Sequence, residues 1–174
     1  MYKNKKGQVW VETVTYTLIA FVLIGLILAY ARPKIQEYQD QSIIEQSMNM
    51  MKQIENTIQE ISEKGIGNKR KIEFSLKGGE FIIIPENNTI SFYLKDSQHM
   101  YSQPDYSYME SGMEVLTNRS GNKFDISIKK EFSNINLTLN DKKLQKTIPK
   151  SNVRYTMYIE NKGGDPKIIN FEVE

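Results

Sequence analysis

Residues 1–31 decide how this chain folds, and they read MYKNKKGQVWVETVTYTLIAFVLIGLILAYA. A short basic leader, residues 1–7, ends in Gly7, and an apolar stretch follows at once. That stretch contains one charged residue, Glu12, and none from Thr13 to Ala31. As a helix with a rise of about 1.5 Å per residue, residues 9–30 would span roughly 33 Å, close to the ~30 Å hydrocarbon core of a bilayer. The sequence therefore predicts a membrane-spanning helix.

A cleaved secretory signal explains this segment less well. Such signals have a shorter apolar core, followed by a cleavage site of small residues. Ala29-Tyr30-Ala31 has that form, but Arg32-Pro33 follows it, and a proline directly after the cut disfavours cleavage.

The charges that flank the helix predict its orientation. Three lysines and the terminal amine precede it, whereas Arg32 and Lys34 follow it. The positive-inside rule then places residues 1–7 in the cytoplasm and the chain after Arg32 outside. We therefore expect a single-pass membrane protein with an external C-terminal part.

Glu12 is the exceptional residue of the apolar stretch. An acid inside a membrane span is costly and is a functional candidate by default. Glu12 also lies near the start of the helix, at the depth where rings such as those of Trp10 and Tyr16 are favoured and the cost is small. Its depth alone leaves both interpretations open.

The segment from Lys5-Lys6-Gly7 to Glu12 resembles the class III signal of type IV pilins and pilin-like proteins, in its archaeal form. Such prepilins carry a basic leader, a glycine before the scissile bond and a glutamate at the fifth mature position. The resemblance covers residues 1 to about 60. It implies cleavage between Gly7 and Gln8 by a prepilin peptidase, and assembly driven by an ATPase and a membrane platform.

The same resemblance implies a role for Glu12 in assembly, in which it pairs with the Gln8 amine of a neighbouring subunit. Archaellins share the signal but usually lack this acid, so Glu12 favours an adhesion-type or minor pilin. Removal of the three lysines in residues 1–7 would change the formal net charge of the chain from +2 to −1.

Apolar residues continue at helical spacing beyond Pro33, which can kink a helix without ending it. They are Ile35, Tyr38, Ile44, Met48, Met51, Ile54, Ile58 and Ile61. Met48, Met50 and Met51 are expected to fill a core rather than to bind a ligand. The segment from Lys64 to Gly67 predicts the end of the helix. We expect a hydrophobic helix over 8–31, continued as an amphipathic helix over 32–64.

After Gly67 the pattern changes to short strands separated by turns. The expected strands are 71–76, 81–84, 89–94, 114–117, 124–129, 135–139, 153–159 and 168–173, with a loop over 161–166. The first three would form a meander. The prediction is an α+β fold, in which residues 68–174 form an antiparallel, sandwich-like head.

The polar segment 95–112 contains Tyr101, Tyr106 and Tyr108 and is expected to be a loop. Exposed tyrosines can form contact surfaces. The favoured interpretation is a surface loop whose tyrosines fold back onto the sheet.

Three Asn-x-Ser/Thr sequences mark Asn87, Asn118 and Asn136 as candidate glycosylation sites. The first two are predicted at turns, and Asn136 in a strand. A glycoprotein is therefore one expectation for an external head.

The composition argues against several other classes. The chain has no cysteine and one histidine, His99, and it contains no catalytic motif. We therefore expect no enzyme activity, cofactor or metal, and the small net charge suggests no nucleic-acid partner.

The sequence thus predicts a structural subunit of an archaeal type IV pilus-like filament. Its expected partners are other copies of itself, the peptidase, the assembly machinery and, before assembly, membrane lipid. The alternatives are an uncleaved signal-anchored binding protein, or a minor pilin of a secretion or archaellum-type machine. What the head contacts is left open.

Overall fold

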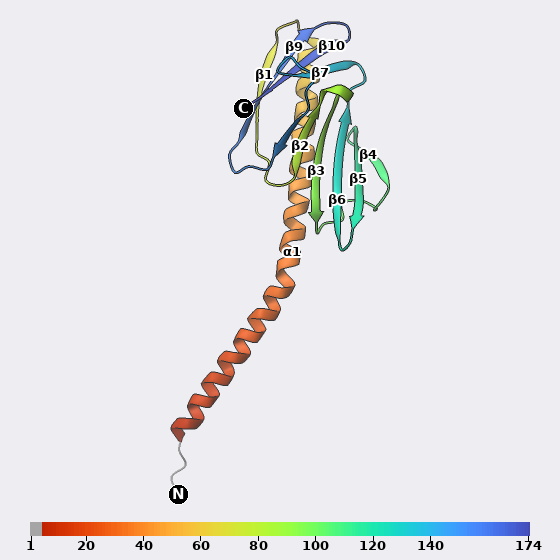
Figure 1. The fold of residues 1–174 in the computed structure, drawn as a ribbon. Helices are drawn as coiled ribbons and strands as arrows, with labels where there is room; N and C mark the ends of the chain where they lie inside the picture. The colour runs from red at the N-terminus through yellow and green to blue at the C-terminus, as the bar shows by residue number, and fades with distance from the viewer. Residues whose placement is uncertain (1–4) are drawn as a thin grey trace.

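The computed structural model describes residues 5–174 of the chain, with side chains from residue 9 onward. It has the predicted α+β class: one long helix, α1 (Lys5–Glu63), precedes a β-rich head (Figure 1). The backbone of Lys5, Lys6, Gly7 and Gln8 already belongs to the helix. The helix therefore begins before residue 8, where the sequence predicted its start, and ends close to the predicted Lys64.

The strands of the head form two sheets. The four-stranded sheet has the order β1 (Lys69–Phe74), β9 (Tyr155–Gly163), β10 (Lys167–Val173) and β7 (Ile135–Leu139). The six-stranded sheet has the order β4 (Ser107–Glu110), β5 (Met113–Ser120), β6 (Lys123–Glu131), β3 (Thr89–Ser97), β2 (Glu80–Ile84) and β8 (Lys146–Pro149). Neighbouring strands are antiparallel except for β10 and β7, which are parallel. A short 3-10 helix, η1 (Pro85–Asn87), joins β2 to β3.

The predicted meander of the first three strands is wrong. Strands β2 and β3 form the expected hairpin, but β1 belongs to the other sheet and pairs with β9. In that pairing Ile72 lies opposite Met157, and both are buried. The other edge of β2 is taken by β8, where Phe81 faces Ile148. Strand pairing here is therefore determined by the burial of apolar residues from distant segments and not by closeness in the sequence.

Two strands, and the C-terminal extension of a third, were not predicted from the sequence. Strand β4 falls in the segment that was expected to be a loop, and β8 contains Pro149; both are only four residues long. Strand β9 continues into the predicted loop, because Asn161 pairs with Ile169 and Gly163 with Ile168 of β10. A partner strand supplies these segments with hydrogen bonds that their own sequences do not predict.

The C-terminal half of α1 is part of the head, whose buried apolar residues form one core with both sheets. The core includes Met48, Met50 and Met51, which confirms the packing role predicted for them. The apolar stripe is buried only from residue 44 onward, since Ile35 and Tyr38 of the predicted stripe are exposed. The head therefore covers the upper half of the helix and leaves the lower half outside.

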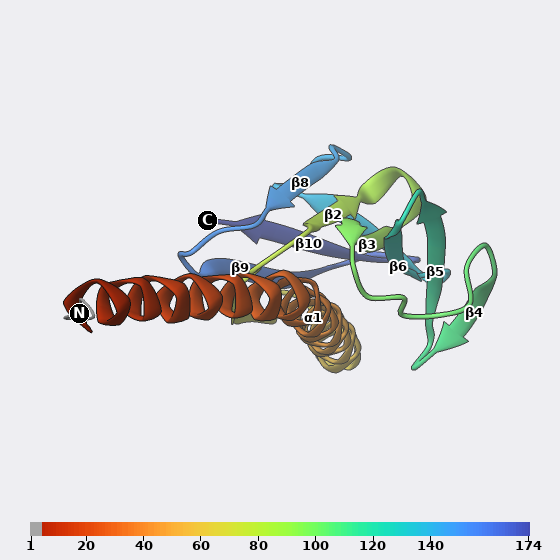
Figure 2. The same cartoon turned by 90° about the horizontal axis from the view of Figure 1, so that it is seen from below.

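The helix bends below the head, as Figures 1 and 2 show. Pro33 lies inside it. A proline within a helix has no N–H for the hydrogen bond to the carbonyl four residues earlier, and its ring crowds that carbonyl. Pro33 thus supplies a cause for the bend without ending the helix.

The tyrosine-containing segment largely folds back, as the favoured interpretation predicted. Tyr101 and Tyr108 are partly buried and pack against the core, whereas Tyr106 is exposed. Both inward-facing hydroxyls donate to Glu110 Oε2, at 3.2 Å from Tyr101 and 2.7 Å from Tyr108. Burial and the neighbouring Glu110 carboxylate raise the pKa of Tyr101 to about 12.

The difference in burial along α1 makes a testable stability prediction. Ile54 is fully buried, whereas Ile35, in the same helix, is 55% exposed. We expect Ile54→Ala to lower the free energy of unfolding of the head by about 2–5 kcal/mol, because it opens a cavity in the core. Ile35→Ala is the matched control and should change it by less than about 0.5 kcal/mol. Denaturant unfolding of the full chain in detergent measures both, and equal effects would contradict the assigned packing.

Candidate functional site: the projecting helix and its attachment

The first candidate functional surface is the lower half of α1. All side chains from residue 9 to residue 30 are exposed, and Leu, Ile, Val and aromatic residues predominate among them. The helix contains an 18-residue window of mean hydropathy 2.3, none of which is buried, so its length and composition would allow it to cross a membrane. An exposed apolar surface of this extent is characteristic of a segment that lipid or another protein covers.

Three threonines in this half add little polarity to its surface. The hydroxyls of Thr13, Thr15 and Thr17 donate to the carbonyls four residues earlier, at 2.8–2.9 Å. In an apolar medium each polar group needs such a partner. These residues are therefore compatible with an apolar environment.

The predicted assembly residue, Glu12, lies on this exposed part of the helix. Tyr16 shares its face because the two residues are four apart. The backbone of Gly7 and Gln8 continues the same helix, but their side chains and those of Lys5 and Lys6 lie outside the described residues. At about 1.5 Å per residue, Gln8 and Glu12 are separated by about 6 Å along the helix axis.

The attachment of α1 to the head begins at Asp40. This acidic side chain is only 4% exposed. Its two oxygens accept hydrogen bonds from the backbone N–H of Gln98, at 2.7 Å, and from Gln36 Nε2, at 2.8 Å. A buried carboxylate is expensive unless it is hydrogen-bonded. Asp40 therefore fixes the helix to the loop that follows β3.

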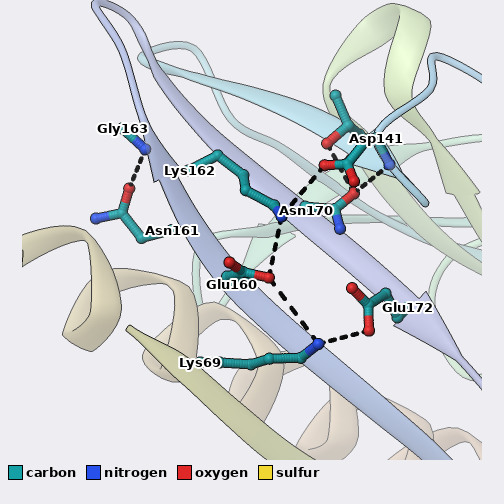
Figure 3. A network of polar contacts seen from close by, with 9 residues as sticks. Lys69, Asp141, Glu160, Asn161, Lys162, Gly163, Asn170 and Glu172 are labelled. Atoms are coloured by element: carbon teal, nitrogen blue, oxygen red, sulfur yellow. Dashed lines mark hydrogen bonds and ion pairs between the residues drawn. The ribbon is translucent and has the colours of Figure 1, made fainter. Parts of the chain in front are cut away.

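Asn161 of β9 holds the other end of the helix. Its Nδ2 donates to the carbonyls of Ile61, at 2.9 Å, and Lys64, at 3.1 Å. Its Oδ1 accepts from the backbone N–H of Gly163, at 2.8 Å (Figure 3). The last carbonyls of a helix lack partners within it, so Asn161 satisfies groups that would otherwise be left without them.

Between these two ends, two ion pairs and one lysine hydrogen bond also attach the helix to the head. Glu55 pairs with Lys130 of β6 at 2.5 Å, and Glu60 pairs with Arg70 of β1 at 3.3 Å. Lys167 Nζ donates to the carbonyl of Ser62 at 2.5 Å. Together with the core, these contacts join α1 to both sheets. The lower half of the helix therefore projects from a fixed base.

A separate chain of charges crosses the four-stranded sheet (Figure 3). Lys69 of β1 contacts Glu172 at 2.5 Å and Glu160 at 3.9 Å, and Lys162 contacts Glu160 at 3.2 Å and Asp141 at 3.4 Å. Exposed pairs of this kind contribute about 0–1 kcal/mol each. We assign this network a structural role, in which it links β1, β9 and β10.

The three candidate glycosylation asparagines differ in their surroundings. Asn87, in η1, and Asn118 are exposed. Asn118 is within β5 and not at the predicted turn. Asn136 is partly buried in β7, as predicted, and its Oδ1 accepts from Asn88 Nδ2 at 3.3 Å. Exposure therefore favours Asn87 and Asn118 as acceptors over Asn136.

Within residues 9–174, no group of three or more His, Cys, Asp or Glu side chains is arranged to hold a metal ion. A cleft of about 500 Å³ lies where the helix enters the head, and it is lined by residues that include Asp40, Lys77, Glu80, Tyr93 and Lys150. Its lining mixes both signs of charge and does not indicate a particular ligand.

Sequence reasoning missed the two polar residues that fix the helix, Asp40 and Asn161. A signal for Asp40 existed: it lies four residues before Ile44, at a position that continues the apolar stripe with an acid. An acid on a buried stripe indicates a hydrogen-bonded carboxylate. Asn161 was assigned to a loop, and its role depends on the approach of two segments 97–100 residues apart.

No protein-family model, curated protein or solved structure matches this chain. The basis for a functional proposal is therefore the chemistry of its own residues and the fold that positions them.

Removal of the Asn161 amide should loosen the upper end of the helix. We expect Asn161→Ala to destabilise the head by about 1–3 kcal/mol, because buried carbonyls lose their donor. Hydrogen exchange should also speed up at the backbone amides of the last turn of α1 and at Gly163. Asn152→Ala, at an exposed asparagine, is the matched control. Unchanged protection in Asn161→Ala would show that the core alone holds this end.

Proposed function

We propose that the protein is a structural subunit of a type IV pilus-like surface filament of the archaeal type. Residues 8–31 would form the filament core after removal of residues 1–7, and residues 32–64 would continue the helix into the head. The observation that carries this proposal is the form of α1: its upper half belongs to the core of the head, and its lower half is apolar and uncovered. A rigid head with a projecting apolar helix suits assembly by helix packing.

The apolar surface of residues 9–31 has to stay out of water both before and after assembly. Each large apolar side chain gains about 1.5–3 kcal/mol when it moves from water into an apolar environment. Lipid would supply that environment before assembly, and the helices of other copies would supply it afterwards. The single-pass arrangement with the head outside allows both states, because only the helix changes its surroundings.

Glu12 would add direction to this contact. An acid and an ammonium attract strongly where water is excluded, and each is expensive to bury alone. Pairing of Glu12 with the Gln8 amine of a parallel neighbour would offset the two helices by about 6 Å along their axes. Apolar packing by itself would permit many offsets, so this pair would select one.

The proposal implies the partners that the signal predicts. A prepilin peptidase would cut after Gly7 at the cytoplasmic face, and an ATPase with a membrane platform would move subunits into the filament. Lys5 and Lys6 would hold the leader on the cytoplasmic side. Adhesion or a related surface role is the proposed use of the filament.

Cleavage at Gly7 is the first test. We expect protein sheared from cells to begin at Gln8, as read by N-terminal sequencing or mass spectrometry. Gly7→Leu should abolish cleavage and leave the precursor in the membrane, whereas Asn4→Ala, a change in the same leader, should be processed normally. Sheared material that retains residues 1–7 would indicate the alternative, an uncleaved signal-anchored protein.

The role of Glu12 is tested separately, after cleavage. We expect Glu12→Ala to be processed like the natural chain but to form far fewer filaments, because the pair that selects the offset between neighbouring helices is lost. Electron microscopy of sheared preparations measures the filaments. Thr13→Ala, at the adjacent residue, is the control. Normal filament numbers in Glu12→Ala would contradict the pairing.

A further inference from the structure

Two segments of the head carry charges of one sign only. Residues 96–118 contain four acids, Asp96, Asp105, Glu110 and Glu114, and no lysine or arginine. Residues 142–154 contain five basic residues, Lys142, Lys143, Lys146, Lys150 and Arg154, and no acid. Such separation is unusual here because lysine, arginine and acids are nearly balanced in number along the chain.

The fold places one strand from each segment at opposite edges of one sheet, whereas Asp96 lies in the inner strand β3 and lines the cleft that Lys150 also lines. Strand β4, within the acidic segment, is the first strand of the six-stranded sheet, and β8, within the basic segment, is the last. Each pairs with a single neighbour, β4 with β5 and β8 with β2. Figure 2 shows the two strands well apart on the head. The edge at β4 therefore carries Asp105, Glu110 and Glu114, with Lys129 of β6 opposite Glu114, and the edge at β8 is flanked by the basic residues.

Most of these charges have no ion-pair partner in the described part of the chain. Lys142, Lys143, Lys150 and Arg154 are exposed and form no salt bridge there, and the same holds for Asp105 and Glu114. Both edges also expose apolar side chains: Tyr106 and Met109 on the acidic side, and Leu144 and Val153 on the basic side. The β4 edge thus offers apolar surface where acids are in the majority, and the β8 edge offers apolar surface beside basic residues.

We propose that the acidic edge around β4 of one head contacts the basic edge around β8 of the next copy. This inference rests on the proposed filament function, and it names the surfaces by which neighbouring heads meet. Because the two surfaces differ, the contact is heterologous and can repeat without closing. A repeating contact of that type suits a helical array of subunits.

The contact is made by side chains and not by a continuous sheet. Pro149, the last residue of β8, has no N–H, and Lys146 begins the strand; proline and lysine both discourage pairing of an edge strand with another strand. Opposite exposed charges instead attract over roughly 8–10 Å at moderate ionic strength, and salt screens them. The proposed contact is therefore specific in direction and weakened by salt.

Cysteine cross-linking tests the contact, because the natural chain contains no cysteine. Ser107 and Thr147 are exposed residues of β4 and β8. We expect cells that express the Ser107→Cys/Thr147→Cys double variant to give a ladder of covalent dimers, trimers and larger species with a short bismaleimide. Each single variant should give none. The control, Ser133→Cys/Thr147→Cys, replaces the β4 site with an exposed turn residue and should give no ladder.

Each outcome separates this contact from the filament proposal. Dimers from a single variant would show a two-fold contact and overturn the heterologous one, as would normal filaments without a ladder in the double variant. A ladder without filaments would support the edge contact and overturn the filament function. Absence of both would overturn both.

Charge reversal provides the second arm of the test, in the background of the cysteine double variant. Asp105→Lys/Glu114→Lys should abolish the ladder, and so should Lys142→Glu/Lys143→Glu. Combining all four changes should restore the ladder, because the two edges then carry opposite charges again, with their signs exchanged. Glu86→Lys, an exposed reversal in η1, is the control and should leave the ladder intact. A ladder that persists in either reversed pair would overturn the electrostatic contact.

Discussion

The burial of the upper half of α1 in the head is the constraint on which the rest of the structure depends. Ile44, Met51, Ile54, Ile58 and Ile61 are all fully or almost fully buried, and they join both sheets into one core with the helix. Because the helix continues unbroken through Pro33, its lower half takes its position from that core. A flexible connection would leave an apolar anchor free to turn, whereas this chain holds the anchor and the head together.

The two halves of the helix meet two different surroundings, and the sequence changes to suit each. From residue 40 onward the helix is amphipathic. The acid on its buried face, Asp40, accepts hydrogen bonds from two donor groups. Below residue 32 the surface is apolar all round, and threonine hydroxyls bond to their own helix. A helix that is apolar on every side needs cover on every side. Lipid and a bundle of like helices are the two environments that provide it.

The extent to which the sequence predicts this structure follows the range of the interactions involved. Helix α1 is predictable because the apolar run and the spacing of residues 44–61 are local, and eight of the strands are predictable from alternation and turns. Strand pairing is not, since β1 meets β9 through contacts between Ile72 and Met157, far apart in the chain. Strands β4 and β8 lack an apolar pattern of their own. The contact of Asn161 with the helix end likewise exists only once the chain has folded.

Apolar packing and charge contribute different things to the proposed assembly. Keeping residues 9–31 out of water is worth a large free energy but has little directional preference, so it holds the helix in lipid or in the filament without choosing an arrangement. Each exposed charge contributes little energy, but an incorrectly placed neighbouring subunit would bring like charges together. Their repulsion would disfavour that arrangement. Glu12 would act in this way between helices, and the acidic and basic edges of the six-stranded sheet between heads. On this view the helix supplies the stability of the filament, and the charges supply its geometry.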